Sequence, residues 1–222
     1  RKVFLDILKK KPYFGEPRIM NFRGVQKFVI DLLDKELPLN LFYHGVHHTF
    51  DVCNAVEELS REENIFGTDL ELLRTAAVMH DIGFIEQYLH NEPVAAKFAH
   101  SILPSFEYSF EQIHIIADII MCTQIPQTPK NHVEQIMCDA DLDYLGRNDF
   151  FTISETLKRE WFANRIISSE EEYNRKQISF FEQHKYYTKS AQRKRDALKQ
   201  LHLLKLKSSL DGSIVEVSNT NL

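Results

Sequence analysis

Apolar side chains recur at intervals of three and four residues along most of this chain, which is the spacing of one face of an α-helix. A clear example is a stripe formed by Val25, Phe28, Val29, Leu32 and Leu33. Residues that interrupt helices are sparse, since the 222-residue chain has 7 glycines and 7 prolines. No alternation of period two lasts long enough to indicate a strand. The sequence therefore predicts an all-α fold.

Capping residues and prolines set the expected ends of the helices. Ser109 and Gln112 form a capping-box pattern at the start of one helix, and Gly146 is expected to end another. Pro126 and Pro129 indicate a loop over residues 122–131. The predicted helices cover residues 22–37, 48–64, 69 to about 89, 93–103, 109–121 and 130–144, with two or three more between 149 and 210.

The helical pattern gives no sign of an internal boundary between residues 22 and 208, so one helical domain is expected there. Residues 1–21 are expected to form an N-terminal extension, and the polar residues 209–222 a flexible tail. The chain begins at Arg1 rather than at methionine, which leaves open a longer protein with further domains.

Composition excludes several classes of protein. The net charge of −5 and the single dense basic run, residues 185–207, argue against a protein that wraps DNA. Apolar residues alternate with the lysines of that run, which favours a solvated helix face. No apolar stretch reaches the ~18 residues that would predict a membrane helix, and no signal peptide is visible. Three widely spaced cysteines without a CxxC pair indicate neither a disulfide framework nor a thiolate zinc site, and favour the cytoplasm.

Residues that bind hard metal ions are concentrated in three short segments. These are Tyr43-His44-Gly45-Val46-His47-His48-Thr49, Met79-His80-Asp81-Ile82-Gly83 and Cys138-Asp139-Ala140-Asp141-Leu142-Asp143. His48, His80 and Asp141 continue the apolar stripes of their helices and are expected to point inward. Taken singly, each is explained as well by a hydrogen-bonded core histidine or a salt-bridged carboxylate. A buried carboxylate is costly unless it is paired or metal-bound, so one ion shared with Asp81 explains all four together.

The order of these segments resembles that of the HD-domain superfamily: a histidine, an adjacent His-Asp pair and a distant aspartate. The resemblance covers roughly residues 40–145 and extends more generally through the C-terminal helices. It implies an HD-domain helical bundle with additional C-terminal helices, and metal-dependent hydrolysis of phosphoesters, often of nucleotides. It assigns the metal ligands to His48, His80, Asp81 and Asp141. Asp139 is less suited, because it points about 160° away from Asp141 around a helix.

The identity and number of the metal ions stay open at this point. Imidazole and carboxylate ligands suit Mn, Fe, Co, Ni or Zn, and Mg at a second position is also compatible. Asp81 is the ligand best suited to bridge two ions. Relatives that hold two ions usually supply extra histidines between the central pair and the last aspartate. In this chain that interval contains His90, His100, His114 and His132.

Hydrolysis also requires a general acid or base and groups that bind the substrate. Asp81, Glu92 and His90 are the predicted catalytic residues, although Glu92 and His90 could equally be structural groups capping the helix beside Pro93. The predicted substrate-binding residues are His44, Thr123 and Lys130. A solvated surface role for Lys130 is also open.

We therefore expect a phosphohydrolase that cleaves a nucleotide phosphomonoester or a cyclic-nucleotide phosphodiester with metal-activated water. The expected partner is this small-molecule substrate, and a homodimer is left open. One alternative is an HD-like regulatory domain that binds a metal or a nucleotide with little or no catalysis. Another is an iron-dependent oxygenase with a di-iron site, which additional histidines in the pocket would favour.

Overall fold

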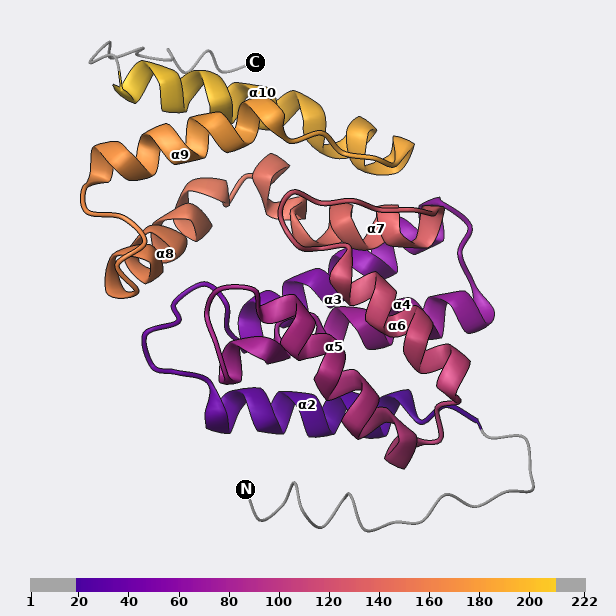
Figure 1. Cartoon of the computed structure of the whole chain (residues 1–222). Coiled ribbons are helices and arrows are strands. Elements are labelled where there is room, and N and C mark those ends of the chain that lie inside the picture. Colours follow the sequence, from indigo (N-terminus) through magenta and orange to yellow (C-terminus); the bar gives the residue numbers. More distant parts are fainter. Residues whose placement is uncertain (1–18, 211–222) are drawn as a thin grey trace. The chain divides into compact units, whose positions relative to one another are not determined.

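The computed structural model of the protein describes residues 19–210, and Figure 1 shows the order of their helices. These residues contain helices and turns but no strand, so the all-α prediction is confirmed. They form two compact units, one ending at Leu142 and the other beginning at Asp143. This division was not predicted. Most of the proposed N-terminal extension (1–21) and of the tail (209–222) lies outside the described residues.

The first unit is built around α4 (Gly67–Met79), which packs against four other helices. Its buried side chains surround the helix axis and include Leu72, Leu73, Ala76 and Ala77, which is typical of a core helix. The surrounding helices are α2 (Phe22–Glu36), α3 (Val46–Glu62), α6 (Phe110–Met121) and α7 (His132–Asp141). The short helix η1 (Ile82–Ile85) follows α4, and α5 (Asn91–Ile102) packs against η1 and α6 before η2 (Leu103–Phe106).

The second unit contains η3 (Asp143–Gly146), α8 (Phe150–Ala163), α9 (Glu170–Gln183) and α10 (Lys189–Leu210). Its helix α10 packs against η3 and α9. Arg195 on α10 donates from Nε and Nη2 to the two carboxylate oxygens of Asp143, at 2.7 and 3.0 Å. His202 Nδ1 donates to the carbonyl oxygen of Leu145 at 2.9 Å. These bonds hold η3 against α10.

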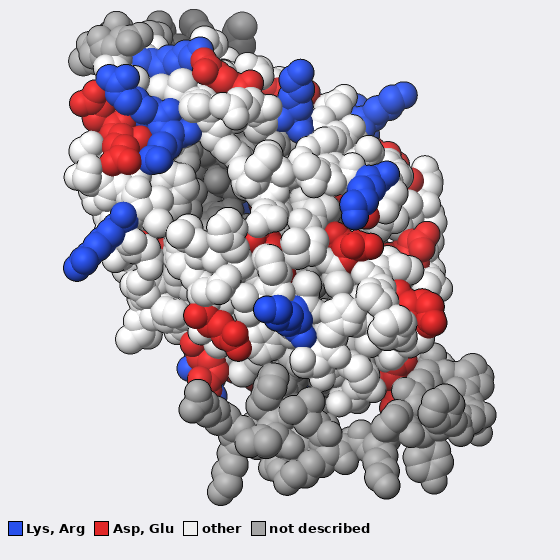
Figure 2. Space-filling model, viewed as in Figure 1, with Lys and Arg blue, Asp and Glu red and all other residues white. Residues whose placement is uncertain are grey.

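The distribution of charged side chains on the surface agrees with the expectation that the basic run over residues 185–207 is a solvated helix face. On the face shown in Figure 2, basic and acidic side chains are interspersed. Most basic residues between 185 and 207 are exposed or half-buried. Lys199 is an exception, because it is 2% exposed and its Nζ donates to the carbonyl oxygen of His184. Within residues 19–210, no helix combines the length and apolarity required to cross a bilayer.

Two predicted helices end earlier than expected. The helix predicted over residues 69–89 ends at Met79, where the chain turns through His80 and Asp81 into η1. The apolar pattern continues because Ile82 and Phe84 in the turn are also buried. The helix predicted over residues 130–144 ends at Asp141, and Gly146 belongs to η3 rather than capping that helix. The capping box of Ser109 and Gln112 is confirmed.

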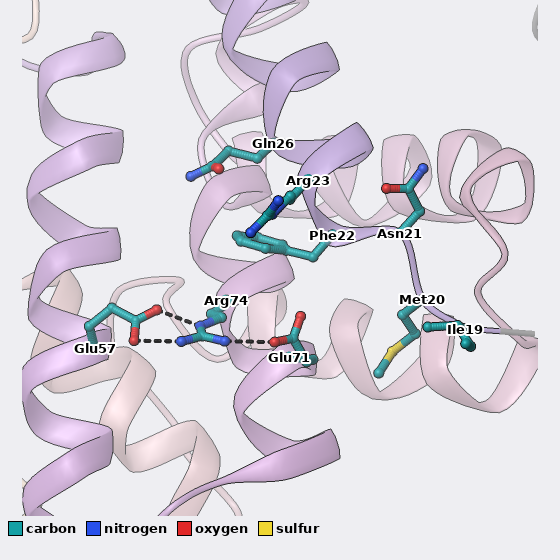
Figure 3. Close-up of a pocket in the computed structure, with 9 residues that line it drawn as sticks. All are labelled: Ile19, Met20, Asn21, Phe22, Arg23, Gln26, Glu57, Glu71 and Arg74. Carbon is teal, nitrogen blue, oxygen red and sulfur yellow. Dashed lines mark hydrogen bonds and ion pairs between the residues drawn. The ribbon is translucent and has the colours of Figure 1, made fainter.

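A pocket of about 620 Å³ lies where the start of α2 meets α3 and α4 (Figure 3). At its base, Arg74 on α4 donates from Nε and Nη2 to the carboxylate of Glu57 on α3, and from Nη1 to Glu71 at 2.6 Å. Burial opposes protonation, but the bonds from these carboxylates raise the pKa of Arg74. The guanidinium therefore joins α3, which has His48 in its first turn, to α4, whose C-terminal cap is His80.

Replacing Arg74 with methionine should lower the free energy of unfolding by about 1–2 kcal/mol, because a two-pronged guanidinium–carboxylate pair is stronger than an ordinary surface pair. Denaturant unfolding measures this change. Lys27→Met is the control, since its pair with Asp31 is exposed and expected to contribute little. Equal effects of the two substitutions would contradict the stronger contribution of Arg74.

Candidate metal centre

Three helix ends meet inside the first unit, and each brings ligand-type side chains. His48 lies in the first turn of α3, after Gly45 begins that helix in an extended conformation. His80 caps the C-terminal end of α4 and Asp81 follows it. Asp141 is the last residue of α7. Because helix ends rather than helix sides converge, His48, His80 and Asp141 bring ligand atoms within 4.8 Å of one another. Asp81 lies beside the two histidines.

The atoms that could bind a metal lie close together. His80 Nε2 is 3.4 Å from His48 Nε2 and 3.4 Å from Asp141 Oδ1, and His48 Nε2 is 3.3 Å from that same oxygen. Asp81 Oδ2 is 3.1 Å from His80 Nε2 and 3.5 Å from His48 Nε2. Neighbouring ligands about 2.1 Å from one ion would be about 3.0–3.4 Å apart in octahedral or tetrahedral geometry. The observed separations match that range closely.

The orientation of His80 and the charges of the two carboxylates also suit a metal. His80 Nδ1 donates to the carbonyl oxygen of Ala77 at 2.8 Å, which orients the ring and leaves Nε2 to face the cluster. Burial lowers the pKa of His80, but the charges of Asp81 and Asp141 outweigh burial and raise that pKa. A metal at Nε2 would take the place of the proton that these charges favour. Burial likewise disfavours ionised carboxylates, yet the histidines lower the pKa of both Asp81 and Asp141. Both carboxylates are therefore ionised, as metal ligands must be.

One buried carboxylate oxygen of this cluster is only partly compensated. Asp81 Oδ2 lies 3.1 Å from His80 Nε2 but has no hydrogen-bond partner of good geometry in the described part of the chain. An ionised oxygen removed from water without hydrogen bonds is costly. A cation among the four side chains would compensate it, so the residues present fit a divalent transition metal.

Comparison with known proteins agrees with this geometry. The family model of the HD domain matches residues 45–143, a segment that contains all four converging side chains. The chain contains an HD domain. HD domains generally occur in metal-dependent hydrolases of the phosphohydrolase superfamily and bind divalent metals. The match ends one residue beyond the end of the first structural unit, and the wider domain boundaries of residues 22–208 stay a prediction.

The relatives do not define the substrate of this HD domain. The chain is 31% identical over 81 residues to an uncharacterized protein of Clostridium beijerinckii (strain ATCC 51743 / NCIMB 8052). This alignment covers 35% of the chain and 51% of the relative, so the chain matches about half the length of that protein. No solved structure matches the chain significantly.

The first of the two predicted acid–base residues, Glu92, has a raised pKa, with burial and the charges of Asp81 and Asp141 among the causes. Glu92 lies in the first turn of α5, and its Oε2 is buried with no hydrogen-bond partner among the described residues. Burial raises the pKa of Glu92, and the charges of Asp81 and Asp141 raise it further. This carboxyl therefore keeps its proton to a higher pH than an ordinary glutamate.

His90 occupies a different environment. It is the N-cap of α5, its side chain is exposed, and its Nδ1 accepts a hydrogen bond from Gln124 Nε2 at 3.3 Å. The contact connects the start of α5 to the residues after α6. This exposed position gives weaker support for proton transfer at the metal centre than the position of Glu92 does.

The predicted substrate residues occupy three different environments. His44 is half-buried, stacks on Phe84 with ring centroids 4.1 Å apart, and lies 5.9 Å from the ring of His48. Thr123 is buried, and its hydroxyl donates to the carbonyl oxygen of Ile120 at 2.9 Å. Lys130 is exposed, with Nζ 3.8 Å from Asp118 Oδ1. Of these three residues, His44 is the one whose ring contacts a side chain of the metal cluster, and the roles of all three stay predictions.

The additional histidines do not build a second histidine-rich site in the described residues. His90, His100, His114 and His132 are all exposed. His100 and His114 pair with each other, with ring centroids 5.0 Å apart, and His132 pairs with Glu63 at 3.2 Å. The structure therefore offers no support for a di-iron oxygenase built from these histidines.

Sequence analysis missed Asn91, which is 7% exposed and has an Oδ1 without a hydrogen-bond partner in the described region. An asparagine near the start of a helix is ordinary, so nothing in the pattern distinguished it. Sequence analysis also missed the contact between Asn91 and Gly83, because two residues that meet across a turn leave no periodic signal.

Removing a bound metal should lower the melting temperature of the protein. An ion present at 100 times its dissociation constant stabilises the folded state by about 2.7 kcal/mol, which corresponds to roughly 5–10 °C for a chain of this size. Thermal melting with and without a chelator measures the difference. His100→Ala, which changes an exposed histidine, should respond to the chelator as the wild type does. Identical curves for wild-type protein with and without chelator would contradict stabilisation by the metal.

Proposed function

We propose that this HD domain hydrolyses a small-molecule phosphoester, either a nucleotide phosphomonoester or a cyclic-nucleotide phosphodiester. The observation that carries the proposal is the convergence of two imidazoles and two ionised carboxylates, in which the buried Asp81 Oδ2 lies beside both histidines but makes no hydrogen bond. The proposed ligands are His48, His80, Asp81 and Asp141. Ligands of these types suit Mn, Fe, Co, Ni or Zn.

An ion held there would polarise the phosphoryl group and lower the pKa of a coordinated water molecule. The protein's own contribution is to fix the ligands before the substrate arrives. The bond from His80 to Ala77 holds one imidazole in place, and the three helix ends hold the remaining ligands. Asp81 is the proposed bridge if a second ion such as Mg binds.

Glu92 is the proposed general acid. Its burial and its two acidic neighbours keep the carboxyl protonated at a pH where an exposed glutamate is ionised. A protonated carboxyl can donate to the oxygen that leaves phosphorus, which is most valuable when that oxygen belongs to an alcohol. Burial is the largest cause of the raised pKa of Glu92. A metal that neutralised the charges of Asp81 and Asp141 would leave this effect of burial in place.

His44 is the proposed contact to the phosphoryl group. The stacked ring of Phe84 and the edge-on ring of Tyr43, with a centroid 4.7 Å away, restrict its orientation. A residue whose orientation is fixed in advance loses little conformational entropy when it binds an anion. Thr123 and Lys130 have other contacts in the structure, so their proposed roles as substrate residues rest on the sequence.

A metal-dependent substrate screen tests the proposed function. Protein stripped of metal and reloaded separately with Mn, Fe, Co, Ni, Zn or Mg would be assayed with mononucleotides, cyclic nucleotides and p-nitrophenyl phosphate. Hydrolysis by wild-type protein, absent in Asp141→Asn, is the expected result. If the protein binds metal but hydrolyses none of these compounds, the phosphohydrolase proposal fails and the regulatory-domain alternative replaces it.

A further inference from the structure

The first turn of α5 lies unusually close to Gly83. A Cβ atom built on Gly83 would be 2.0 Å from the carbonyl oxygen of Asn91, 2.8 Å from the carbonyl carbon of that residue and 3.1 Å from the backbone nitrogen of Ala95. All three are backbone atoms, so they cannot move aside without moving the helix. Only glycine permits this approach.

This contact joins two segments that matter for the proposed chemistry. Gly83 follows Asp81 by two residues, and Asn91 directly precedes Glu92. The turn that carries a metal ligand is thus pressed against the helical turn that carries the proposed general acid. Asn91 is almost fully buried in this arrangement.

The loop between the two segments turns sharply at His90, and hydrogen bonds from Gln87 stabilise the turn. His90 has φ 58° and ψ 47°, a left-handed conformation that is unfavourable for a residue with a side chain. Gln87 Nε2 donates to the carbonyl oxygens of Leu89 and His90, at 2.9 and 2.6 Å. Backbone strain of this kind persists where surrounding contacts hold it, and these bonds and the Gly83 contact hold the bend.

We propose that Gly83 is a positioning residue: by having no side chain, it seats the first turn of α5 against the turn after His80 and so holds the Glu92 carboxyl near the metal ligands. The inference rests on the proposed function, since it assigns Glu92 to proton transfer. It predicts that added volume at residue 83 moves Glu92 without removing a ligand.

Gly83→Ala and Gly146→Ala form a matched pair for testing this. A Cβ at Gly146 would lie 2.4 Å from the carbonyl oxygen of Arg195, a similar backbone clash in the second unit. Both variants should lose stability, and both should retain metal. Only Gly83→Ala should lower kcat for an alkyl phosphoester, by about 10²-fold for a displacement near 1 Å, with KM little changed.

A second readout does not depend on turnover. In zinc-loaded protein labelled with carbon-13 at glutamate carboxyls, NMR titration gives the pKa of Glu92. That pKa should fall toward the ordinary value in Gly83→Ala and stay raised in Gly146→Ala. If Gly83→Ala does not fold, Gln87→Leu, which removes both bonds from an exposed side chain, should shift the pKa and kcat in the same direction.

The outcomes separate this inference from the proposed function. Wild-type protein that hydrolyses no phosphoester defeats the function, while the NMR titration still reports whether residue 83 controls the environment of Glu92. An active wild type, with a Gly83→Ala variant that keeps both its kcat and the raised pKa of Glu92, overturns the inference. If Gly83→Ala does not fold and only Gln87→Leu can be measured, an unchanged kcat together with an unchanged pKa of Glu92 overturns the inference as well.

Discussion

Replacing Asp81 with alanine is expected to abolish metal-dependent phosphoester hydrolysis while leaving the helices formed. The substitution removes the oxygen that lies 3.1 Å from His80 Nε2 and 3.5 Å from His48 Nε2. Without it, the remaining ligands lose a negative charge and a coordination position. Turnover of p-nitrophenyl phosphate and the metal content of the purified variant measure the loss.

The fold should survive this change because the core of the first unit is aliphatic, with fully buried side chains such as Leu73, Ile116 and Leu33 on three different helices. Circular dichroism is expected to show wild-type helicity for Asp81→Ala. Asp118→Ala is the matched control, because Asp118 is an exposed carboxylate whose ion pair with Lys130 measures 3.8 Å. Substantial activity remaining in Asp81→Ala would remove this residue from the proposed ligand set.

The second large effect is expected for Glu92→Gln, which should slow turnover of an alkyl phosphoester by about 10² to 10⁴-fold if Glu92 is the general acid. Metal content should be unchanged, because Glu92 is not a proposed ligand. The effect on p-nitrophenyl phosphate should be smaller, since nitrophenolate leaves without help from an acid. Paired measurements of kcat on the two substrates test the assignment.

The direction of the pH dependence follows from the raised pKa of Glu92. A general acid works in its protonated form, so wild-type kcat should be highest below that raised pKa and fall as pH increases through it. Glu92→Gln should lose this limb of the profile. His90→Gln is the control, since His90 is exposed, and a larger loss in that variant than in Glu92→Gln would reverse the assignment.

Helical periodicity predicted the inward direction of the side chains that form the candidate metal centre. His48 and His80 were expected to point inward because they continue apolar stripes, and they are 5% and 1% exposed in the structure. The inward direction of Asp141 follows from the same reasoning, and its Oδ1 reaches both histidines. The prediction succeeded because side-chain direction along a helix is a local property of the sequence.

Features that depend on contacts between distant residues were not predictable in this way. The apolar pattern continues from Met79 into Ile82 and Phe84, so it extended the predicted helix through the turn at His80 and Asp81. After that turn Gly83 packs against the backbone of α5, and such a contact leaves no periodic signal in the sequence. The division of the chain after Leu142 also escaped prediction, because helices on both sides of it have similar apolar spacing.

Metal analysis of the purified protein tests the central claim most directly. Wild-type protein loaded with each divalent transition metal and then freed of excess ions should retain at least one equivalent of metal per chain. His80→Ala and Asp141→Ala should retain far less, whereas His100→Ala, at an exposed histidine, should match the wild type. Wild-type protein that retains no metal, or His80→Ala and Asp141→Ala variants that retain as much as the wild type, would contradict a metal centre built from these residues.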